Sequence, residues 1–308
     1  MADNRIIITL GDPWGIGPEI TLKALEKIKV DPSRIILAGS SVLWERLLDG
    51  KPDPAGQVID IPFEDPFISG HPPIAGGVVP LQTLQTASVL LKNKEAAALV
   101  TAPINKTLIQ HEEPGFVGHT EFLGNFFEVS EPTMFFVGPQ LKTALVTTHV
   151  SMANLPSMIT QKRILAHLEN INRYLKSTGK TQAKIGVCGL NPHAGEHGAF
   201  GREEIEVIAP AVVEACKEGI PAEGPFPADT LYKKGLDGTY EVILAMYHDQ
   251  ALTLFKSTDQ NRGVNVTLGL PILRTSPDHG TAYDIAGKGI ADPSSMEAAI
   301  RLALEYVF

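Results

Sequence analysis

The chain has 308 residues, of which 44% are hydrophobic and 20% charged, an ordinary composition for a soluble globular protein. This length can bury a large core and predicts two domains or one large α/β unit. A formal net charge of −9 leaves no sizeable basic patch, which argues against a nucleic-acid partner. It still allows a locally basic pocket for a small phosphorylated ligand.

The cysteines and the N-terminus favour a cytoplasmic protein with no membrane partner. Cys188 and Cys216 lack CxxC spacing, so buried, reduced thiols are the simplest interpretation. The apolar run at 6–10 is too short for a signal peptide. No apolar run approaches the roughly 18 residues that a membrane helix needs.

Apolar runs and amphipathic stretches alternate along the chain. The run at 6–10 predicts a buried strand, followed by the turn GDPWGIGPE and a helix with Pro18 in its first turn. Further strands are predicted at 34–38, 96–100, 143–148, 184–189 and 240–246, and further helices around Trp44 and at 82–92, 161–176, 203–217 and 296–306. The Pro/Gly-rich stretches 50–80 and 218–228 are interpreted as loops. This alternation predicts a mostly parallel α/β sheet covered on both faces.

Three of the nine histidines, His149, His193 and His248, come at or just beyond the C-terminal ends of predicted strands. In open α/β sheets that edge is where ligands bind. Three neutral imidazoles converging there would hold a divalent metal and leave positions for substrate oxygens. Any one alone is better explained as a loop histidine satisfied by backbone groups. Sequence separation does not show whether the three meet, within one subunit or across two.

Polar groups suited to an anion recur after predicted strands, above all in the stretch 240–293. Short donors and fixed positive charge are the groups expected for a phosphate or carboxylate. The candidates are His119, Thr120, Lys256, Asn265 and Arg274. A lone Arg or Lys is usually solvated surface, but Arg274 lies among small and apolar residues in ILRTSP. Composition and spacing therefore indicate a metal-assisted enzyme acting on a small anionic substrate.

The two glycine-rich turns are weaker signals. GDPWGIGPE lacks the GxGxxG spacing of a Rossmann-type dinucleotide site, and a tight strand-to-helix turn explains its glycines equally well. GLNPHAGEHGAFG lacks the GxxxxGK[ST] spacing of a phosphate loop, although its backbone amides could cradle a ligand. Within it, His197 is better explained as a surface or supporting group than as a ligand.

A series of motifs in order along almost the whole chain resembles the 4-hydroxythreonine-4-phosphate dehydrogenase family of vitamin B6 biosynthesis. They are GDPWGIGPE, TAPINK, GHTEF, TTH, GLNPHAGE, GPFPADT, YHDQ and VNVTLGLPILRTSPDHGTA. The resemblance implies an isocitrate/isopropylmalate dehydrogenase-like α/β fold: two α/β/α domains with mostly parallel sheets, 1–135 with 262–308 and 136–261. It also implies a homodimer with the active site in the interdomain cleft at the subunit interface.

The resemblance carries the site roles over position by position. The metal, a divalent ion such as zinc, magnesium or cobalt, would be bound by His149, His193 and His248. The substrate would be bound by His119, Thr120, Lys256, Asn265 and Arg274. The stretch DHGTAYDIAGKGIADP resembles the loop for the adenosine half of NAD in the related dehydrogenases. By that likeness the cofactor would contact His279, Gly280, Thr281 and Ala282, while Asp284 would accept from the ribose hydroxyls and favour NAD over NADP.

The implied reaction is the NAD-dependent oxidation and decarboxylation of 4-phosphohydroxy-L-threonine to 3-amino-2-oxopropyl phosphate and CO2. The metal would lower the pKa of the C3 hydroxyl while NAD takes the hydride. Asp229 and Asp249 are candidates for proton handling or for supporting the ligands, with a structural role about equally expected for each.

Two departures from the family pattern leave alternatives open. Trp14 stands where a small residue is usual, and HVSM follows the first metal histidine where HLPL-like residues are expected. Both changes bear on the substrate pocket and raise the leading alternative, a paralogue that oxidises another four-carbon phosphorylated acid such as 4-phospho-D-threonate or 4-phospho-D-erythronate. Dihydrodiol dehydrogenases are more distant, and Lys256 and Arg274 argue against them. A binding or regulatory protein without turnover is the alternative from another class, and the complete histidine trio argues against it.

Overall fold

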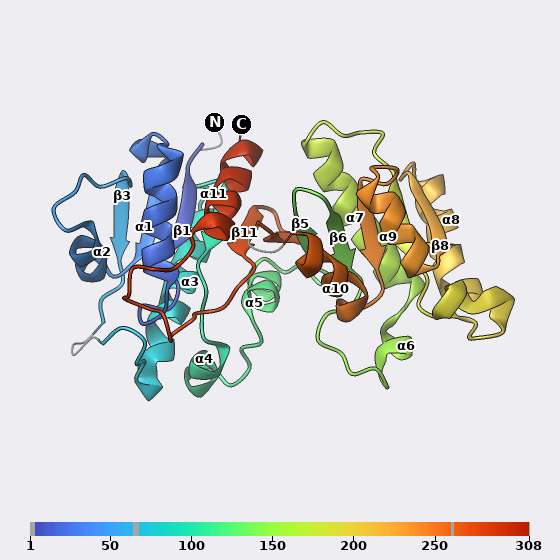
Figure 1. The fold of residues 1–308 in the computed structure, drawn as a ribbon, viewed down its shortest axis with the longest axis horizontal. Coiled ribbons are helices and arrows are strands. Elements are labelled where there is room, and N and C mark those ends of the chain that lie inside the picture. Colours follow the sequence, from blue (N-terminus) through green and yellow to red (C-terminus); the bar gives the residue numbers. More distant parts are fainter. Residues whose placement is uncertain (1–3, 64–67, 260–261, 308) are drawn as a thin grey trace. The chain divides into compact units, whose positions relative to one another are not determined.

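The structure is a computed structural model that describes residues 4–63, 68–259 and 262–307. The chain forms two compact units. Unit 1 comprises Met1–Glu128 and Leu270–Phe308, and unit 2 comprises Val129–Gly269. Figure 1 shows unit 1 in blue, cyan and red and unit 2 in green, yellow and orange.

The strands of unit 1 form a wholly parallel run. Their spatial order is β3 (Gln57–Asp60), β2 (Ile35–Gly39), β1 (Ile6–Thr9), β4 (Ala98–Thr101) and β11 (Leu273–Pro277). Because all these strands are parallel, the loops after β1, β4 and β11 leave the sheet at one carboxyl edge.

Helices cover both faces of these strands. The face that includes Ile7, Ile36 and Leu99 packs against apolar residues of α3, α4 and α5. On the other side α11 packs against α1, which also contacts α2. The bounds are α1 (Gly17–Ile28), α2 (Ser41–Leu48), α3 (Val78–Lys92), α4 (Lys106–Glu112), α5 (His119–Phe126) and α11 (Ser294–Tyr306), with 3-10 turns η1 (Pro32–Arg34) and η2 (Ile74–Gly77).

Unit 2 is a mixed sheet. Its order is β10 (Val264–Leu268), β5 (Thr133–Val137), β6 (Lys142–Leu145), β9 (Val242–Ala245), β7 (Ile185–Cys188) and β8 (Ala222–Phe226). The pairs β10–β5 and β5–β6 are antiparallel, whereas β6, β9, β7 and β8 run parallel. The parallel neighbours β6, β9 and β7 therefore end at the same edge of the sheet. These strands precede His149, His248 and His193.

Unit 2 also has helices on both faces. Phe136, Leu145 and Ile243 form a core with Leu231 of α9 and Phe255 of α10. The opposite face is covered by α7 and α8, which contact each other. The bounds are α6 (Leu155–Met158), α7 (Gln161–Ser177), α8 (Ala209–Lys217), α9 (Ala228–Leu236) and α10 (His248–Thr258), with η3 (Pro192–Gly198) and the π-helical turn η4 (Glu204–Ile208).

The predicted fold class is confirmed, with differences in detail. The stretches interpreted as loops contain β3 and β8, and α3 already begins at Val78. β3 and β8 lie at the ends of the strand order and are only partly buried, so they lack the continuous apolar run of a central strand. The predicted strands also leave out β5, β10 and β11, which lie inside the order and are mostly buried. The units divide at 128/129 and 269/270 rather than at the predicted 135/136 and 261/262, because β5 pairs along its length with β6 and β10 of unit 2.

One helical stretch in the described chain, Ile74–Lys92, is long and apolar enough to cross a membrane by length and composition. Of its most apolar window, 56% is buried inside the protein. Leu84, Ala87 and Leu91 belong to the core of unit 1. This burial is typical of a core helix, and the stretch is weak evidence for a membrane span.

Candidate active site

The carboxyl edge of β6, β9 and β7 carries the three predicted metal histidines. His149 follows β6, His248 is the first residue of α10 directly after β9, and His193 lies in η3 after β7. Since these strands are parallel neighbours, the sequence-based placement of all three histidines beyond strand ends is correct.

Two of these histidines lie close together. The ring centroids of His149 and His248 are 5.9 Å apart. The Nδ1 atom of His248 lies 2.7 Å from Oδ1 of Asp249, whose side chain is 83% exposed. If Nδ1 carries the proton and donates it to this carboxylate, Nε2 keeps a lone pair for a metal ion. Within the described residues of a single chain, no group of three or more His, Cys, Asp or Glu side chains is placed to hold a metal. His193 therefore stands apart from this pair.

The loop that carries His193 has an unusual backbone. Five consecutive residues, His193 to His197, have positive φ between 42° and 79°. Only one of them is glycine, and each non-glycine residue in this region costs roughly 1 kcal/mol or more. Strain of this kind persists only where surrounding contacts fix it.

Glu204 provides such contacts. Its side chain is buried, with the residue only 3% exposed. Its Oε1 accepts from the backbone N–H groups of Leu190 and Asn191, both at 2.7 Å, and its Oε2 accepts from Asn191 Nδ2 at 3.0 Å. A Cβ built on Gly195 would lie 2.6 Å from Oε2 of Glu204, so the turn also sits directly against this carboxylate. Glu204 thus holds the loop that carries His193 in place through these contacts.

Gln250 connects the two strand ends that precede His193 and His248. Its Oε1 accepts from Met246 N at 2.7 Å, and its Nε2 donates to Gly189 O at 2.8 Å. The glutamine of YHDQ therefore fixes the start of α10 against the end of β7.

Unit 1 holds a buried cation on β11. Arg274 is 4% exposed, and its Nε and Nη2 donate to Oγ1 of Thr101 at 3.1 and 2.7 Å. Burial lowers the pKa of Arg274 to about 10, against the effect of Glu121, so the side chain is still positively charged at neutral pH.

The start of α5 lies in the field of this cation. Burial, followed by the charges of Arg274 and Lys106, lowers the pKa of His119 well below its usual value, so its imidazole is neutral at pH 7. Gly118 precedes the helix and supplies no side-chain cap to its first turn, which contains Thr120. A Cβ on Gly118 would lie 3.0 Å from Glu121 Oε2 and 3.2 Å from Lys106 Nζ, so a carboxylate and an ammonium are both close to the helix start. Cationic groups and a helix N-terminus together favour an anion.

The remaining predicted substrate and catalytic residues lie in unit 2. Lys256 is exposed on the last turn of α10. The Oδ1 atom of Asn265 on β10 is buried and has no hydrogen-bond partner among the described residues, as expected for a group that awaits a ligand. Asp229 is exposed in the first turn of α9 and accepts from Thr230 N at 3.0 Å.

The predicted cofactor loop follows β11 at the carboxyl edge of unit 1. His279, Gly280 and Asp284 are exposed, whereas Thr281 and Ala282 are partly buried. Thr281 O accepts from Ile16 N of the GDPWGIG turn at 2.9 Å. The loop is therefore attached to the turn after β1 and presents its polar residues outward.

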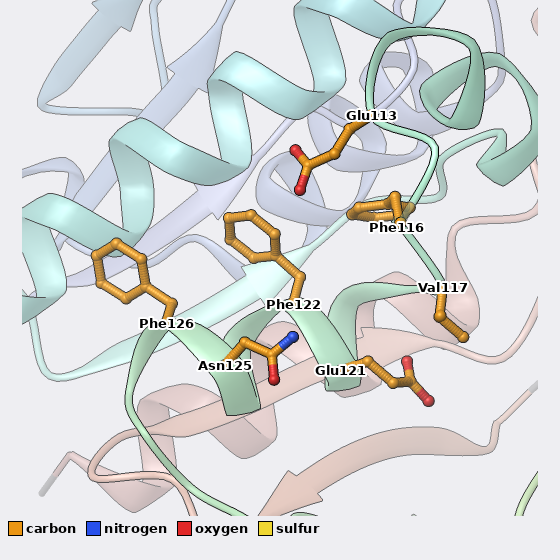
Figure 2. A pocket seen from close by; sticks show the side chains of 8 residues that line it. Glu113, Phe116, Val117, Glu121, Phe122, Asn125 and Phe126 are labelled. Carbon is orange, nitrogen blue, oxygen red and sulfur yellow. The ribbon is translucent and has the colours of Figure 1, made fainter.

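A cavity of about 330 Å³ lies beside α5 in unit 1. Figure 2 shows its aromatic wall of Phe116, Phe122 and Phe126, with Glu113 and Glu121 among the other lining residues. None of the predicted site residues lines this cavity. His119 and Thr120 begin α5. Phe122 and Phe126, later in the same helix, line the cavity.

Sequence reasoning missed several supporting residues. Thr101 and Lys106 both belong to TAPINK, the polar segment at the end of β4. Polar residues directly after a predicted strand were the signal that could have identified them. Glu204 and Gln250 also lie in or beside quoted motifs, but their role depends on burial and hydrogen bonding that spacing does not reveal.

Comparison with known proteins agrees with this geometry. Residues 22–303 match the family described as "Pyridoxal phosphate biosynthetic protein PdxA". The chain is 39% identical to a 4-hydroxythreonine-4-phosphate dehydrogenase from Desulforapulum autotrophicum, over 98% of this chain and 96% of the relative. It is also 39% identical to a "Putative D-threonate 4-phosphate dehydrogenase" from Oceanobacillus iheyensis, over 99% and 98%.

A solved structure extends the likeness to three dimensions. The crystal structure of 4-hydroxythreonine-4-phosphate dehydrogenase from Klebsiella pneumoniae superposes with a TM-score of 0.87 at 34% identity, covering 99% of both chains. Family match, full-length relatives and shared fold agree. The chain therefore belongs to the PdxA family of pyridoxal phosphate biosynthetic proteins, a family of dehydrogenases.

Proposed function

We propose that this protein is a cytoplasmic, homodimeric dehydrogenase that uses NAD and a divalent metal ion. Its substrate would be 4-phosphohydroxy-L-threonine, which it would oxidise and decarboxylate to 3-amino-2-oxopropyl phosphate and CO2. The dehydrogenase role follows from the family. The cofactor, the metal, the substrate and the residue roles are our proposal.

The observation that carries the proposal is the buried Arg274 beside the start of α5. Arg274, Lys106 and the first N–H groups of α5 together provide charge-assisted donors for a phosphate or a carboxylate. Neutral His119 adds a hydrogen bond without a further charge.

The unit 2 histidines suit a divalent ion. The spacing of the His149 and His248 rings is compatible with two imidazoles on one ion, whose bonds to nitrogen are about 2.1 Å long. The contact between His248 and Asp249 supports the tautomer that binds through Nε2. Zinc, magnesium or cobalt bound there would act as a Lewis acid toward the substrate hydroxyl.

A second subunit would complete this site. His193 and His149 are both exposed in the single chain, and His193 is outside the His149–His248 pair. Homo-oligomers commonly build sites across a two-fold interface, and a dimer that brings His193 of one subunit to the pair of the other accounts for all three histidines.

The loop after β11 suits the adenosine half of NAD. Exposed Asp284 can accept from ribose hydroxyls and would repel the 2′-phosphate of NADP. NAD bound there would accept the hydride from the substrate carbon. His279, Gly280, Thr281 and Ala282 would contact the adenine.

The chain's own residues divide the remaining work. Arg274, His119, Thr120, Lys256 and Asn265 would bind and orient the phosphate and carboxylate ends of the substrate. Asp249 would hold the His248 ring, and Asp229 is the second candidate for proton handling. Both carboxylates are exposed in the single chain.

A second substrate is supported by the relatives. Full-length chains described as acting on 4-hydroxythreonine 4-phosphate and on D-threonate 4-phosphate share the same 39% identity with this chain. These substrates carry a phosphate on a four-carbon acid and would use the same anion-binding groups. 4-Phospho-D-threonate and 4-phospho-D-erythronate are therefore the alternatives.

Both readings are tested by following NADH absorbance with purified protein, NAD and each of the three phosphorylated acids. Mg²⁺, Zn²⁺ and Co²⁺ are added separately after treatment with a chelator. We expect turnover of 4-phosphohydroxy-L-threonine that requires metal. Turnover of 4-phospho-D-threonate alone would transfer the proposal to the second substrate, and no turnover of any acid would favour a binding protein.

A further inference from the structure

The turn after β1 contains a buried carboxylate that the proposed chemistry does not use. Asp12 is fully buried, and its Oδ1 accepts from Trp14 N at 2.9 Å. Its other oxygen, Oδ2, accepts from the hydroxyl of Tyr283 in the loop after β11. Burial raises the pKa of Asp12, and burial together with Asp12 raises that of Tyr283. The two side chains thus share a hydrogen bond that is buried at Asp12 and partly buried at Tyr283.

This contact joins three loops at the carboxyl edge of unit 1. Asp12 also donates its backbone N–H to Pro103 O of the loop after β4, at 2.9 Å. The side chains of Asn105 and Thr281 act on the Tyr283 hydroxyl and lower its pKa, against the raising effects of burial and Asp12. Asn105 in turn caps α4, since its Oδ1 accepts from Leu108 N at 3.2 Å. The phenol therefore lies where the loops after β1, β4 and β11 meet.

The backbone around Tyr283 is held just as closely. A Cβ added to Gly15 would lie 2.9 Å from Thr281 O, and one added to Gly70 would lie 2.5 Å from Tyr283 O. Ala282, immediately before the tyrosine, has a left-handed φ of 44°. An alanine rarely adopts this conformation, so its neighbours must maintain it. The loop is thus anchored on one side, while His279 and Asp284 are exposed on the other.

We propose that the Asp12–Tyr283 hydrogen bond is a positioning contact for the dinucleotide, which holds residues 279–284 in the conformation that receives the adenosine half. The inference rests on the proposed function, because it takes NAD as the ligand of this loop. Neither residue is a catalytic group in this account. Ordering the loop before the cofactor arrives lowers the entropy cost of binding.

Tyr283→Phe tests this role, because it removes the hydroxyl and keeps the ring. Tyr240→Phe is a matched control in unit 2, where the Tyr240 hydroxyl donates to Glu223 Oε2 at 2.8 Å. We expect Tyr283→Phe to raise the KM for NAD about tenfold with kcat within about twofold. Tyr240→Phe should leave both constants unchanged.

Amide hydrogen exchange of the protein without cofactor provides a readout independent of turnover. Peptides covering 279–289 should exchange faster in Tyr283→Phe and not in Tyr240→Phe. The double variant Asp12→Asn/Tyr283→Phe should bind NAD no more weakly than Asp12→Asn alone, since the pair acts as one unit.

The outcomes separate the two levels of the proposal. Unchanged exchange together with an unchanged KM in Tyr283→Phe would overturn the positioning role and leave the proposed cofactor intact. Faster amide exchange throughout unit 1, with kcat and KM altered together, would show that the Asp12–Tyr283 hydrogen bond only stabilises the fold. That result would also overturn the positioning role. A wild-type protein that binds no NAD in calorimetry would overturn the proposed cofactor itself.

Discussion

The carboxylate of Glu204 accepts hydrogen bonds from both the backbone and the side-chain amide of Asn191, at 2.7 and 3.0 Å. This relationship links a buried side chain of the π-helical turn to the strained loop that carries His193. A loop with several residues at positive φ relaxes if its anchor is removed. The geometry of His193 therefore depends on a residue that would not itself contact a metal.

Glu204→Gln should weaken metal binding without abolishing the fold. The glutamine places an N–H₂ group against existing N–H donors, so at least one buried hydrogen bond is lost, at a cost of about 1–3 kcal/mol. We expect metal affinity to fall about 10- to 100-fold, as when other groups that support ligands are removed. Isothermal titration with Zn²⁺ or Co²⁺ measures this effect.

Glu206→Gln is the matched control for that variant. Glu206 lies in the same turn, but its side chain is 56% exposed and pairs with Arg202 on the surface. Exposed pairs contribute about 0–1 kcal/mol, so metal affinity should not change. Equal losses in both variants would contradict a specific role for Glu204.

Arg274→Lys should weaken substrate binding while preserving the positive charge. Lysine lacks the planar fork that lets Nε and Nη2 both reach Thr101, so it cannot hold an anion in the same orientation. We expect the KM for the phosphorylated acid to rise at least about tenfold. Steady-state kinetics at saturating NAD provide the measurement.

Arg301→Lys is the corresponding control on unit 1. The Arg301 guanidinium is 50% exposed on α11 and pairs with Glu297 one turn earlier. This substitution should change neither KM nor kcat. An Arg274→Lys enzyme with a normal KM would show that the buried cation serves the fold rather than the substrate.

The sequence predicted β1, β2, β4, β6, β7 and β9 of the parallel core, with their ends, because these strands depend on local patterns. Central strands such as β1 and β9 are continuous apolar runs, and the histidines after β6, β7 and β9 follow them directly. Arg274 was also recognisable, because a cation among small and apolar residues is rarely idle surface.

The parts that could not be predicted depend on contacts between distant segments. The edge strands β3 and β8 are half-exposed and lack a clear apolar run. The pairing of Asp12 with Tyr283 joins residues 271 positions apart, and no spacing rule connects them. Whether His193 joins His149 and His248 depends on backbone conformation and assembly, which a single sequence does not encode locally.

A buried histidine of unit 2 should make stability depend on pH. His167 is 3% exposed, its Nε2 lies 3.1 Å from Val146 O, and its Nδ1 lies 2.7 Å from the Thr133 hydroxyl. Because a carbonyl only accepts, Nε2 carries the proton and Nδ1 accepts from Thr133. Burial, followed by the charge of Arg163, lowers the pKa of His167 to about 4.

The sign of the effect follows from this lowered pKa. Between pH 6.5 and about 4 the unfolded chain binds a proton at His167 and the folded protein does not, so stability is lost as the pH falls through this window. From pH 7.5 to 4.5 the loss from this group should be about 2.5 kcal/mol, at 1.36 kcal/mol per pKa unit. Urea unfolding at both pH values measures it.

His167→Gln isolates that contribution. The variant loses hydrogen bonds and should be less stable at pH 7.5, but its further loss between pH 7.5 and 4.5 should be smaller than that of the wild type by about 2.5 kcal/mol. Carboxylates that titrate in the same range are common to both proteins and cancel in the difference. Parallel pH profiles would refute a neutral, buried His167.

The metal role of His193 can be separated from the strain of its loop. His193→Ala should reduce bound metal, measured by elemental analysis after dialysis, and should abolish metal-dependent turnover. His197→Ala alters another histidine with positive φ, at 55°, in the same turn. It should retain metal and activity. Loss of metal in both variants would indicate that metal binding depends on the conformation of the turn rather than on the His193 imidazole.

Subunit mixing decides whether the histidines meet across a dimer. His193 lies outside the His149–His248 pair in one chain, so we expect each complete site to combine His193 of one subunit with the pair of the other. His193→Ala and His248→Ala should each be inactive, but in a heterodimer both defects fall in one site and the other site is intact. Random co-assembly makes about half of the dimers mixed, each with one working site of two, so activity should recover to about a quarter of the wild type. No recovery, with mixed dimers demonstrated by differential tagging, would place all three ligands within one subunit.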